Sequence, residues 1–405
     1  MKVILLGAGA SKAYSESASQ VRMPIANDFF QTFRKLDIAE NTWVLIGNIL
    51  NYLKTYHHIT SFESFDRYNI DIEQIHSEIE LKLKEFLENT ADSKDVFLGR
   101  HLCFKAYTEL IFLFSSVINE IQNGPVSKAH INLVDQLKME DVIITFNWDT
   151  LVDRALYTKK EWNCFTGYHV TPFAVYQDQW NIDEGEARQS DAPLLLKLHG
   201  STNWLTSAPI VEGNKWQSIQ ELSNNNFCIF QNATKPYPTY DGRYMKGYQE
   251  FSYGYYPVNL PLKGVGLPDG YFLSRGILRT GYNPKGEAED IGLTSIPLII
   301  PPVKNKNYDY FGSLFDDLWD KALESITNAD EIIIIGYSFP ETDYKSDRLF
   351  RTAFSKRSNM PHIVIIDPNP ERVAERFRLN FGIPDSHLKV IKDYFSDKFD
   401  FGSLL

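Results

Sequence analysis

The sequence predicts an α/β fold, a Rossmann-like doubly wound parallel sheet with an inserted helical module. The first observation is a set of short, continuous apolar runs, which are typical of parallel strands buried on both faces. The clear runs are Val3–Leu6, Asp141–Thr145, Leu194–Leu198, Glu331–Ile335 and His362–Ile366, with weaker ones at Leu388–Ile391 and Ser295–Ile300. The second is that helical patterns separate several runs, at Tyr310–Thr327, Asp347–Ser355 and Pro370–Asn380. Alternating strands and helices indicate helices on both faces of one sheet.

Two stretches interrupt this alternation and divide the predicted sheet domain into residues 1–37, 140–205 and 293–405. Residues 38–139 contain almost no strand signal. Instead, Ile72–Asn89 and Lys105–Asn123 carry apolar residues at three- and four-residue spacing, as amphipathic helices do. Residues 206–292 are rich in Tyr, Gly, Pro and Asn, which favours a lid or an interaction surface.

Composition narrows the function classes. The 405 residues carry a formal net charge of −11, which disfavours direct nucleic-acid binding. Cys103, Cys164 and Cys228 are widely spaced, so neither a zinc ribbon nor a disulfide framework is indicated, and we expect no metal. No apolar run approaches the roughly 20 residues of a membrane span, so we expect a cytoplasmic protein without a membrane partner.

A glycine-rich turn follows the first strand, with the sequence Gly-Ala-Gly-Ala-Ser over Gly7–Ser11. Glycines there let the backbone approach a pyrophosphate, while amides at the next helix start point toward it. The alternative is a tight strand–helix turn without a ligand.

Polar residues also follow the strand that ends at Thr145. Asn147 and Asp149 lie where open α/β sheets place their ligands, at a strand's carboxyl end. Asp149 could instead cap the helix predicted from Leu151 to Tyr157, and the two roles are compatible.

Three further strand ends carry candidate residues. His199 follows the run that ends at Leu198, Gly336 and Ser338 follow Ile335, and Asp367 follows Ile366. An acidic group at a strand end can accept hydrogen bonds from ribose hydroxyls. The alternatives are a structural histidine, a turn and a helix cap, respectively.

Together these five motifs resemble those of the sirtuin (silent information regulator 2) family, and most of all its sirtuin-like NADase branch in bacterial anti-phage defence proteins. Gly7–Ser11 is similar to the family's Gly-Ala-Gly-x-Ser loop, and Pro24 to the proline after it. Thr145–Asp149 resembles Thr-Gln-Asn-Ile-Asp, and Leu198–Gly200 resembles the Leu-His-Gly that carries the catalytic histidine.

The resemblance continues toward the end of the chain. Gly336–Ser338 is similar to Gly-Thr-Ser, and Ile366–Asp367 to the family's Ile-Asn. The segment Gly336–Asp343 looks especially like the defence branch. The resemblance covers the predicted sheet domain in the family's order, but neither insertion.

The resemblance implies a set of site residues. The candidate NAD+-binding residues are Gly7, Ala8, Gly9, Ser11, Pro24, Asp149, Gly336, Ser338 and Asp367, and the candidate catalytic residues are Asn147 and His199. The implied reaction is hydrolysis of NAD+ to nicotinamide and ADP-ribose, with an oxocarbenium-like transition state as in glycoside cleavage. Asn147 would orient the ribose and the water, and His199 would act as general base, for which an ordinary histidine pKa near 6.5 is suitable.

Departures from the family pattern count against a protein deacylase, and two alternatives to NAD+ hydrolysis remain open. The four-cysteine zinc module of protein-deacylating sirtuins cannot be built from this sequence, and Phe146 and Trp148 replace a glutamine and a small aliphatic residue. The alternatives are a sirtuin-type protein deacylase and a non-catalytic sensor of NAD+ or ADP-ribose.

Unregulated NAD+ hydrolysis would be toxic to the cell, so the resemblance implies control by assembly, a phage-derived trigger or a partner. We expect a homo-oligomer whose activity is low in isolation, with a HerA-type ATPase as a candidate partner. The 38–139 insertion lies between the glycine-rich turn and the Asn147 strand, which makes it the candidate regulatory element, with a passive structural cap as the alternative.

Overall fold

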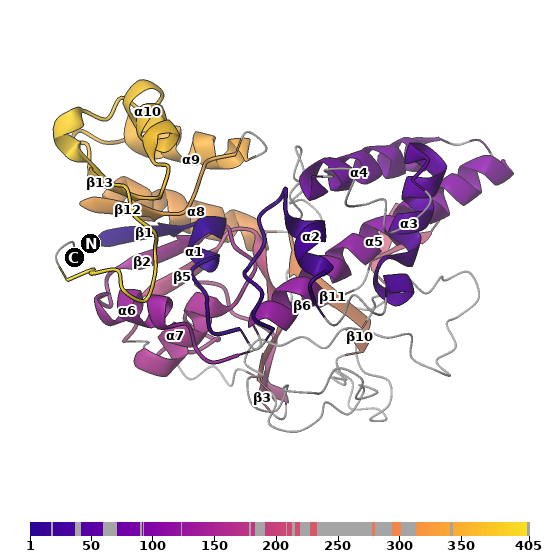
Figure 1. The fold of residues 1–405 in the computed structure, drawn as a ribbon, viewed down its shortest axis with the longest axis horizontal. Helices are drawn as coiled ribbons and strands as arrows, with labels where there is room; N and C mark the ends of the chain where they lie inside the picture. Colours follow the sequence, from indigo (N-terminus) through magenta and orange to yellow (C-terminus); the bar gives the residue numbers. More distant parts are fainter. Residues whose placement is uncertain are drawn as a thin grey trace.

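A computed structural model gives the three-dimensional arrangement of the chain (Figure 1). It describes residues 1–17, 19–36, 42–59, 71–89, 91, 93–122, 124–177, 180–182, 191–207, 209–212, 215–218, 227–232, 278–279, 294–300, 313–340 and 343–402.

The main sheet has six strands, and every neighbouring pair in it is parallel. Its strands are β1 (Lys2–Leu6), β2 (Val142–Thr145), β5 (Leu194–Lys197), β12 (Glu331–Ile335), β13 (His362–Ile366) and β14 (Leu388–Ile391). All six coincide with predicted apolar runs to within one residue at each end. The predicted α/β class with a parallel, Rossmann-like sheet is therefore confirmed.

The strand order is β14-β13-β12-β1-β2-β5. Along the chain, the order runs outward from β1 through β2 to β5, then returns to β12 on the other side of β1 and runs outward again. This is the 3-2-1-4-5-6 order of dinucleotide-binding sheets, and its switch point lies between β1 and β12. Ligands of such sheets bind outside the carboxyl ends of the strands at this point.

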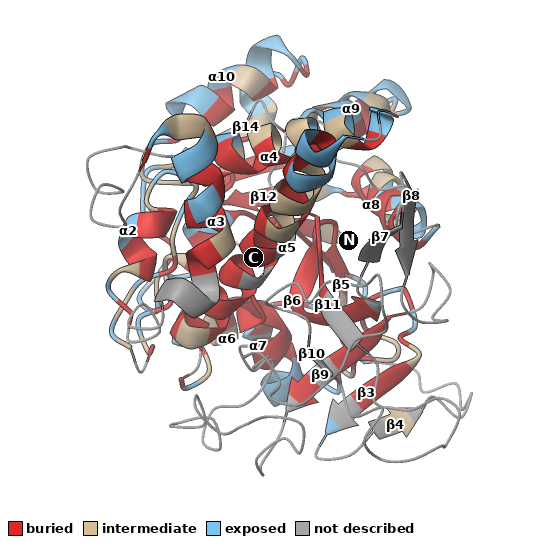
Figure 2. Cartoon of the chain, turned by 90° about the vertical axis from the view of Figure 1, so that its right-hand side faces the viewer, coloured by how far each residue is buried: buried red, intermediate tan, exposed pale blue. Residues whose placement is uncertain are grey.

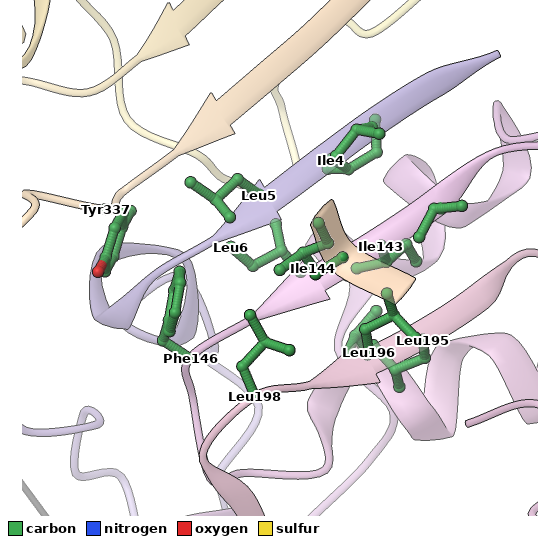
Figure 3. Packing of buried hydrophobic residues seen from close by; sticks show 14 of the residues in the cluster. Ile4, Leu5, Leu6, Ile143, Ile144, Phe146, Leu195, Leu196, Leu198 and Tyr337 are labelled. Atoms are coloured by element: carbon green, nitrogen blue, oxygen red, sulfur yellow. The ribbon is translucent and has the colours of Figure 1, made fainter. Parts of the chain in front are cut away.

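Helices from both halves of the chain pack against this sheet in one hydrophobic core (Figures 2 and 3). They are α6 (Lys128–Asp135), α7 (Leu151–Lys159), α8 (Leu314–Asn328), α9 (Tyr344–Ser355) and α10 (Glu371–Leu379), followed by a short 3₁₀ helix, η4 (Asp385–His387). Helix α9 begins three residues before the predicted start, whereas the predicted start of α8 at Tyr310 lies outside the described residues.

A second sheet is mainly antiparallel, with the order β10-β11-β6-β9-β3-β4. Its strands are β3 (Ala174–Gln177), β4 (Trp180–Ile182), β6 (Gly200–Ser207), β9 (Cys228–Asn232), β10 (Leu278–Arg279) and β11 (Thr294–Ile299), and β7 (Pro209–Glu212) pairs with β8 (Lys215–Ser218) as a hairpin. Several of these strands fall in the 206–292 stretch, where we expected a lid or an interaction surface rather than strands. Most of that stretch, including 233–277, lies outside the described residues.

The expectation that Ser295–Ile300 forms a strand of the parallel sheet is wrong, because β11 pairs antiparallel with β6 in the second sheet. An apolar run shows that a strand is buried but not which strand lies beside it. Gly200 decides the pairing here. Its φ of +74° redirects the chain after β5, and a Cβ atom on it would lie 2.0 Å from the Leu298 carbonyl oxygen.

The helices of the predicted insertion form a second hydrophobic core. Helices α3 (Thr42–His57), α4 (Ile72–Glu88) and α5 (Lys94–Gln122) contribute to it, whereas α6 packs with the sheet core. Helix α2 (Phe29–Phe33) also contributes, although its residues lie in the 1–37 segment that the sequence assigned to the sheet domain. In α4 the predicted face is buried at Ile72, Ile75, Ile79 and Leu83, and Phe86 packs against it. Leu151 of α7 and Ile299 of β11 also belong to this core, so it reaches the carboxyl edge of the main sheet. Figure 1 shows α3–α5 on that side of the molecule.

Helix α5 is long and apolar enough to cross a membrane by length and composition alone, which we did not expect from the sequence. However, 75% of its most apolar window is buried inside the protein, between α3 and α4. This is the environment of a core helix, because packing against its neighbours already removes its apolar surface from water.

The buried ring of His76 in α4 makes folding sensitive to acid. Neither ring nitrogen has a hydrogen-bond partner among the described residues, and burial lowers its pKa from 6.5 to about 3. Between these values the unfolded chain binds the proton and the folded chain does not, so stability is complete above pH 6.5 and is lost as the pH falls toward 3. His130, whose pKa is lowered to about 4, acts in the same direction.

We therefore expect the urea midpoint of unfolding to fall between pH 7.5 and pH 5, and to fall less in His76→Phe. Phenylalanine suits the site because the His76 ring already packs against aromatic rings, with its centroid 4.9 Å from that of Tyr107 and 5.9 Å from that of Phe114. The exposed His362→Phe is the control and should keep the wild-type pH dependence. An equal fall of the urea midpoint in His76→Phe and in the wild type would contradict the prediction.

Candidate functional site

The glycine-rich turn lies in direct backbone contact with the end of β12. The amide of Gly7 donates to the Ile335 carbonyl at 3.0 Å, and that of Gly9 donates to the Gly336 carbonyl at 2.9 Å. A Cβ atom on Gly7 would lie 2.5 Å from the Tyr337 Cα, and one on Gly336 would lie 2.5 Å from the Ala10 nitrogen. The glycines are needed because two chain segments cross at the switch point of the sheet.

This contact changes the role expected for the turn. We expected its backbone amides to point toward a pyrophosphate, but the amides of Gly7, Gly9 and Ala10 donate to carbonyls within the protein. Helix α1 (Ala8–Ser11) has only four residues, so its dipole is short as well. The side chain of Ser11, described next, is the polar group that the turn presents.

The close contact at Gly336 predicts a graded loss of stability on adding a methyl group. Gly336 and Gly382 have similar φ angles, +60° and +70°, but nothing lies within 4 Å of a Cβ atom built on Gly382. Gly382→Ala should therefore cost about 1–2 kcal/mol through left-handed backbone strain alone. Gly336→Ala should cost about a further 1–3 kcal/mol through overpacking, measured by chemical denaturation. If both variants lost the same stability, the backbone around Gly336 could move to accommodate the methyl group.

Ser11, Asn147 and Asp149 form one hydrogen-bonded group above the ends of β1 and β2. The Ser11 hydroxyl donates to Asp149 Oδ2 at 2.5 Å, and Asn147 Nδ2 donates to Ser11 Oγ at 2.8 Å and to the Gly7 carbonyl at 2.7 Å. Asp149 Oδ1 accepts from the Leu151 amide at 3.1 Å, so the same carboxylate also caps the first turn of α7. Ser11 and Asp149 are buried, whereas Asn147 is half-buried.

A buried ion pair between Lys197 and Asp153 holds the backbone of Asp149 in place. Lys197 and Asp153 are both fully buried, and Lys197 Nζ lies 3.2 Å from Asp153 Oδ2. The same ammonium donates to the Asp149 carbonyl at 2.5 Å, and the Tyr168 hydroxyl donates to Asp153 Oδ1. Burial raises the pKa of Asp153, and Lys197 and Tyr168 oppose that rise.

His199 follows β5 at the level of Asn147. Thr145, the last residue of β2, pairs with Lys197, the last residue of β5, and each candidate residue stands two positions beyond the end of its own strand. Neighbouring strands lie about 4.8 Å apart, so both side chains belong to the same edge of the sheet. The His199 ring is buried, with its centroid 5.0 Å from that of Phe146 and 6.5 Å from that of Trp319.

A carboxylate reaches His199 from a different part of the chain. Asp343, immediately before α9, places Oδ1 3.5 Å from His199 Nε2, and its Oδ2 accepts from the Tyr337 hydroxyl at 2.5 Å. The Tyr337 ring in turn stacks on Phe146, with centroids 4.5 Å apart and an angle of 14° (Figure 3).

The other predicted residues lie further from this group. Ser338 is exposed, and its carbonyl accepts from Arg372 at 2.8 Å. Asp367 follows β13, two strands from β1, and accepts from the Asn369 amide at 2.7 Å. Pro24 is half-buried next to Met23, which belongs to the helical core rather than to the sheet edge.

Sequence reasoning missed Asp343, Tyr337, Lys197, Asp153 and Tyr168 as members of the site. One signal was present: Lys197 interrupts an apolar strand, and a lysine is almost never fully buried without a partner. Asp343 and Tyr337 stood in a quoted motif, but only the fold shows that they reach His199.

Among the described residues, no group of three or more His, Cys, Asp or Glu side chains is arranged to hold a metal ion. Cys103, Cys164 and Cys228 are buried, and the Cys164 thiol donates to the Gln231 side-chain oxygen at 3.2 Å.

Comparisons with known proteins give only distant similarities to solved structures. No protein-family model and no curated protein matches the sequence. Among solved structures, the chain is similar to a Sir2 crystallised with the inhibitor EX-527, 2'-O-acetyl-ADP-ribose and a deacetylated p53 peptide, at 12% identity and a TM-score of 0.32, covering 98% of this chain and 89% of that one. A structure described as the structural basis of sirtuin substrate affinity matches at 14% identity and a TM-score of 0.33, covering 100% and 91%. No activity follows from likenesses at this level.

Proposed function

We propose that this chain is an NAD+ glycohydrolase that cleaves the nicotinamide–ribose bond, and that it depletes NAD+ in anti-phage defence. The observation that carries the proposal is that Ser11, Asn147 and Asp149 share hydrogen bonds at the carboxyl edge of the sheet, while His199 follows the neighbouring strand β5 at the same edge. These residues come from three separate strand ends.

The chemistry of the group suits glycosidic cleavage. Leaving of nicotinamide develops positive charge on the ribose, which nearby oxygen acceptors stabilise. Asn147 offers an amide oxygen, since its nitrogen is held by Gly7 and Ser11, and that oxygen can orient a ribose hydroxyl or the attacking water. His199 is the general base, and Asp149 is proposed to face the nicotinamide amide. Gly7–Gly9, Gly336 and Ser338 would line the dinucleotide, with Asp367 toward the adenosine and Pro24 beyond the turn.

Burial supports regulation of this site. His199 is only 5% exposed, so a substrate reaches its ring only after neighbouring groups move. The helical module contacts the same edge, because Phe114 of α5 packs 5.1 Å from Trp148, the residue between Asn147 and Asp149. We propose that the chain acts as a homo-oligomer whose assembly, a phage-derived trigger or a HerA-type ATPase relieves this burial through α5.

The test is to incubate the purified chain with NAD+, with and without an acetylated peptide, and to identify the products by chromatography. Nicotinamide and ADP-ribose formed without peptide support the proposal. Consumption of NAD+ only with peptide, and formation of O-acetyl-ADP-ribose, would show a deacylase. If NAD+ binds but is not consumed, with or without candidate partners, the chain is a sensor.

A further inference from the structure

His199 has a buried acidic neighbour that the proposed reaction has not yet used. Its Nε2 atom lies 3.5 Å from Asp343 Oδ1, and the two side chains are 6% and 2% exposed. A buried carboxylate is costly unless charged or hydrogen-bonding partners compensate for lost water. An acidic residue held against a buried histidine therefore indicates a specific pairing.

The position of Asp343 is determined by several hydrogen bonds. Its second oxygen accepts from Tyr337 at 2.5 Å, its amide donates to the Pro340 carbonyl at 3.0 Å, and its own carbonyl accepts from the Ser346 hydroxyl at 2.7 Å. Hydrogen bonds to an ionised acceptor are roughly twice as strong as neutral ones. Both the backbone and the carboxylate of Asp343 are thus held, and its Oδ1 is directed at the histidine.

The fold brings this pair together across two strands. Tyr337 follows β12, whereas His199 follows β5, and β1 and β2 lie between them. Gly7 leaves room for the crossing, because a Cβ atom there would lie 2.6 Å from the Tyr337 Cβ. Tyr337 then stacks on Phe146 (Figure 3), and the Phe146 ring centroid lies 5.0 Å from that of His199.

We propose that Asp343, held by Tyr337, is the positioning residue that orients His199 and keeps the proton of the neutral ring on Nε2. The lone pair then lies on Nδ1, which is the atom that takes the proton from a ribose hydroxyl or from water. A carboxylate beside a catalytic histidine has this effect in hydrolytic triads, where it selects the tautomer without accepting the proton itself. The catalytic part of the proposal rests on the proposed function, whereas the tautomer does not.

Charged and titratable groups near His199 come from the segment before α9 and from α9 itself. Asp343 and Tyr337 lie on the segment between β12 and α9, and Lys345 of α9 stands 4.8 Å above the Trp319 ring that packs against the histidine. Phe146, from the end of β2, contributes an uncharged ring.

The kinetic test is Asp343→Asn, which keeps the shape of the side chain and removes its charge. We expect kcat for NAD+ cleavage to fall about tenfold or more, with KM changed less than about threefold, because the general base is misdirected while NAD+ contacts remain. Asp347→Asn, in the first turn of the helix that Asp343 precedes, is the matched control. Its carboxylate pairs with Arg351 and Arg376 instead, and the variant should keep wild-type kcat. An unchanged kcat in folded Asp343→Asn would overturn the catalytic role.

The structural test does not depend on activity. In protein labelled with ¹⁵N-histidine, two-dimensional NMR of the imidazole nitrogens should show His199 as the Nε2-protonated tautomer at neutral pH, assigned with His199→Gln. Asp343→Asn should give a mixture of the two tautomers. Tyr337→Phe should do the same, and because it keeps the stacking ring, it serves as the test if Asp343→Asn does not fold. An Nδ1-protonated ring in the wild type, or an unchanged ring in both variants, would overturn the proposal. If the wild type shows the tautomer but does not cleave NAD+, the pairing holds and the proposed function fails.

Discussion

Replacing either Asn147 or His199 with alanine is expected to reduce the rate of NAD+ cleavage by about a hundredfold or more, the usual contribution of a positioned acid–base group. Asn147→Ala removes the amide that is held by Gly7 and Ser11 and that is proposed to orient the ribose and the water. His199→Ala removes the proposed base. The measurement is steady-state release of nicotinamide, with circular dichroism to compare the folds.

Two controls separate a catalytic loss from a structural one. His199→Gln keeps a polar side chain beside buried Asp343 and should be as inactive as His199→Ala, but more stable. The exposed His362→Ala, on β13, should keep full activity. Near-normal turnover in both Asn147→Ala and His199→Ala would refute the assignment of these residues.

Replacing Lys197 with methionine is expected to cost about 3–5 kcal/mol of stability, because it leaves a buried carboxylate without its cation. Asp153 is fully buried, and its pKa is already raised by burial. The variant also loses the hydrogen bond to the Asp149 carbonyl. The unfolding free energy from urea titration measures the loss.

The reference for this loss is the double variant Lys197→Met with Asp153→Leu, which removes both charges. It should recover much of the stability, because apolar replacements of a whole buried pair are often neutral. Lys392→Met, which breaks a surface pair with Glu371 whose side chains are 66% and 69% exposed, should cost far less stability than Lys197→Met. If the Lys197 and Lys392 variants lost the same stability, the buried pair would not support the site.

The predicted elements that agree with the structure are those with a strong local pattern. The strand from Glu331 to Ile335 is predictable because burial on both faces produces a continuous apolar run. The helical face of Ile72, Ile75, Ile79 and Leu83 is predictable because burial of one face imposes a helical period on the residues. The partner of Ser295–Ile300 was not readable, because the same apolar run satisfies a parallel or an antiparallel neighbour.

The candidate site divides in the same way. Asn147 and His199 could be proposed from the sequence because each directly follows a recognisable strand, and parallel strands bring their carboxyl ends to one edge. The amides of the glycine-rich turn were assigned to a ligand, but several of them bond to β12 and to the turn itself. A local motif shows that glycine is needed, but it does not show whether a ligand or another segment of the chain lies against it.

By itself, the sequence determined the parallel sheet, the helical faces and the strand ends that carry polar residues, because each depends on residues close together in the chain. Only the tertiary structure decided that Asp343 faces His199, that Tyr337 crosses Gly7 to stack on Phe146, and that Lys197 pairs with Asp153 beneath Asp149. The physical reason is that these contacts join separate segments of the chain. Their geometry depends on strand order and on the packing of whole elements, and neither leaves a periodic trace in the local sequence.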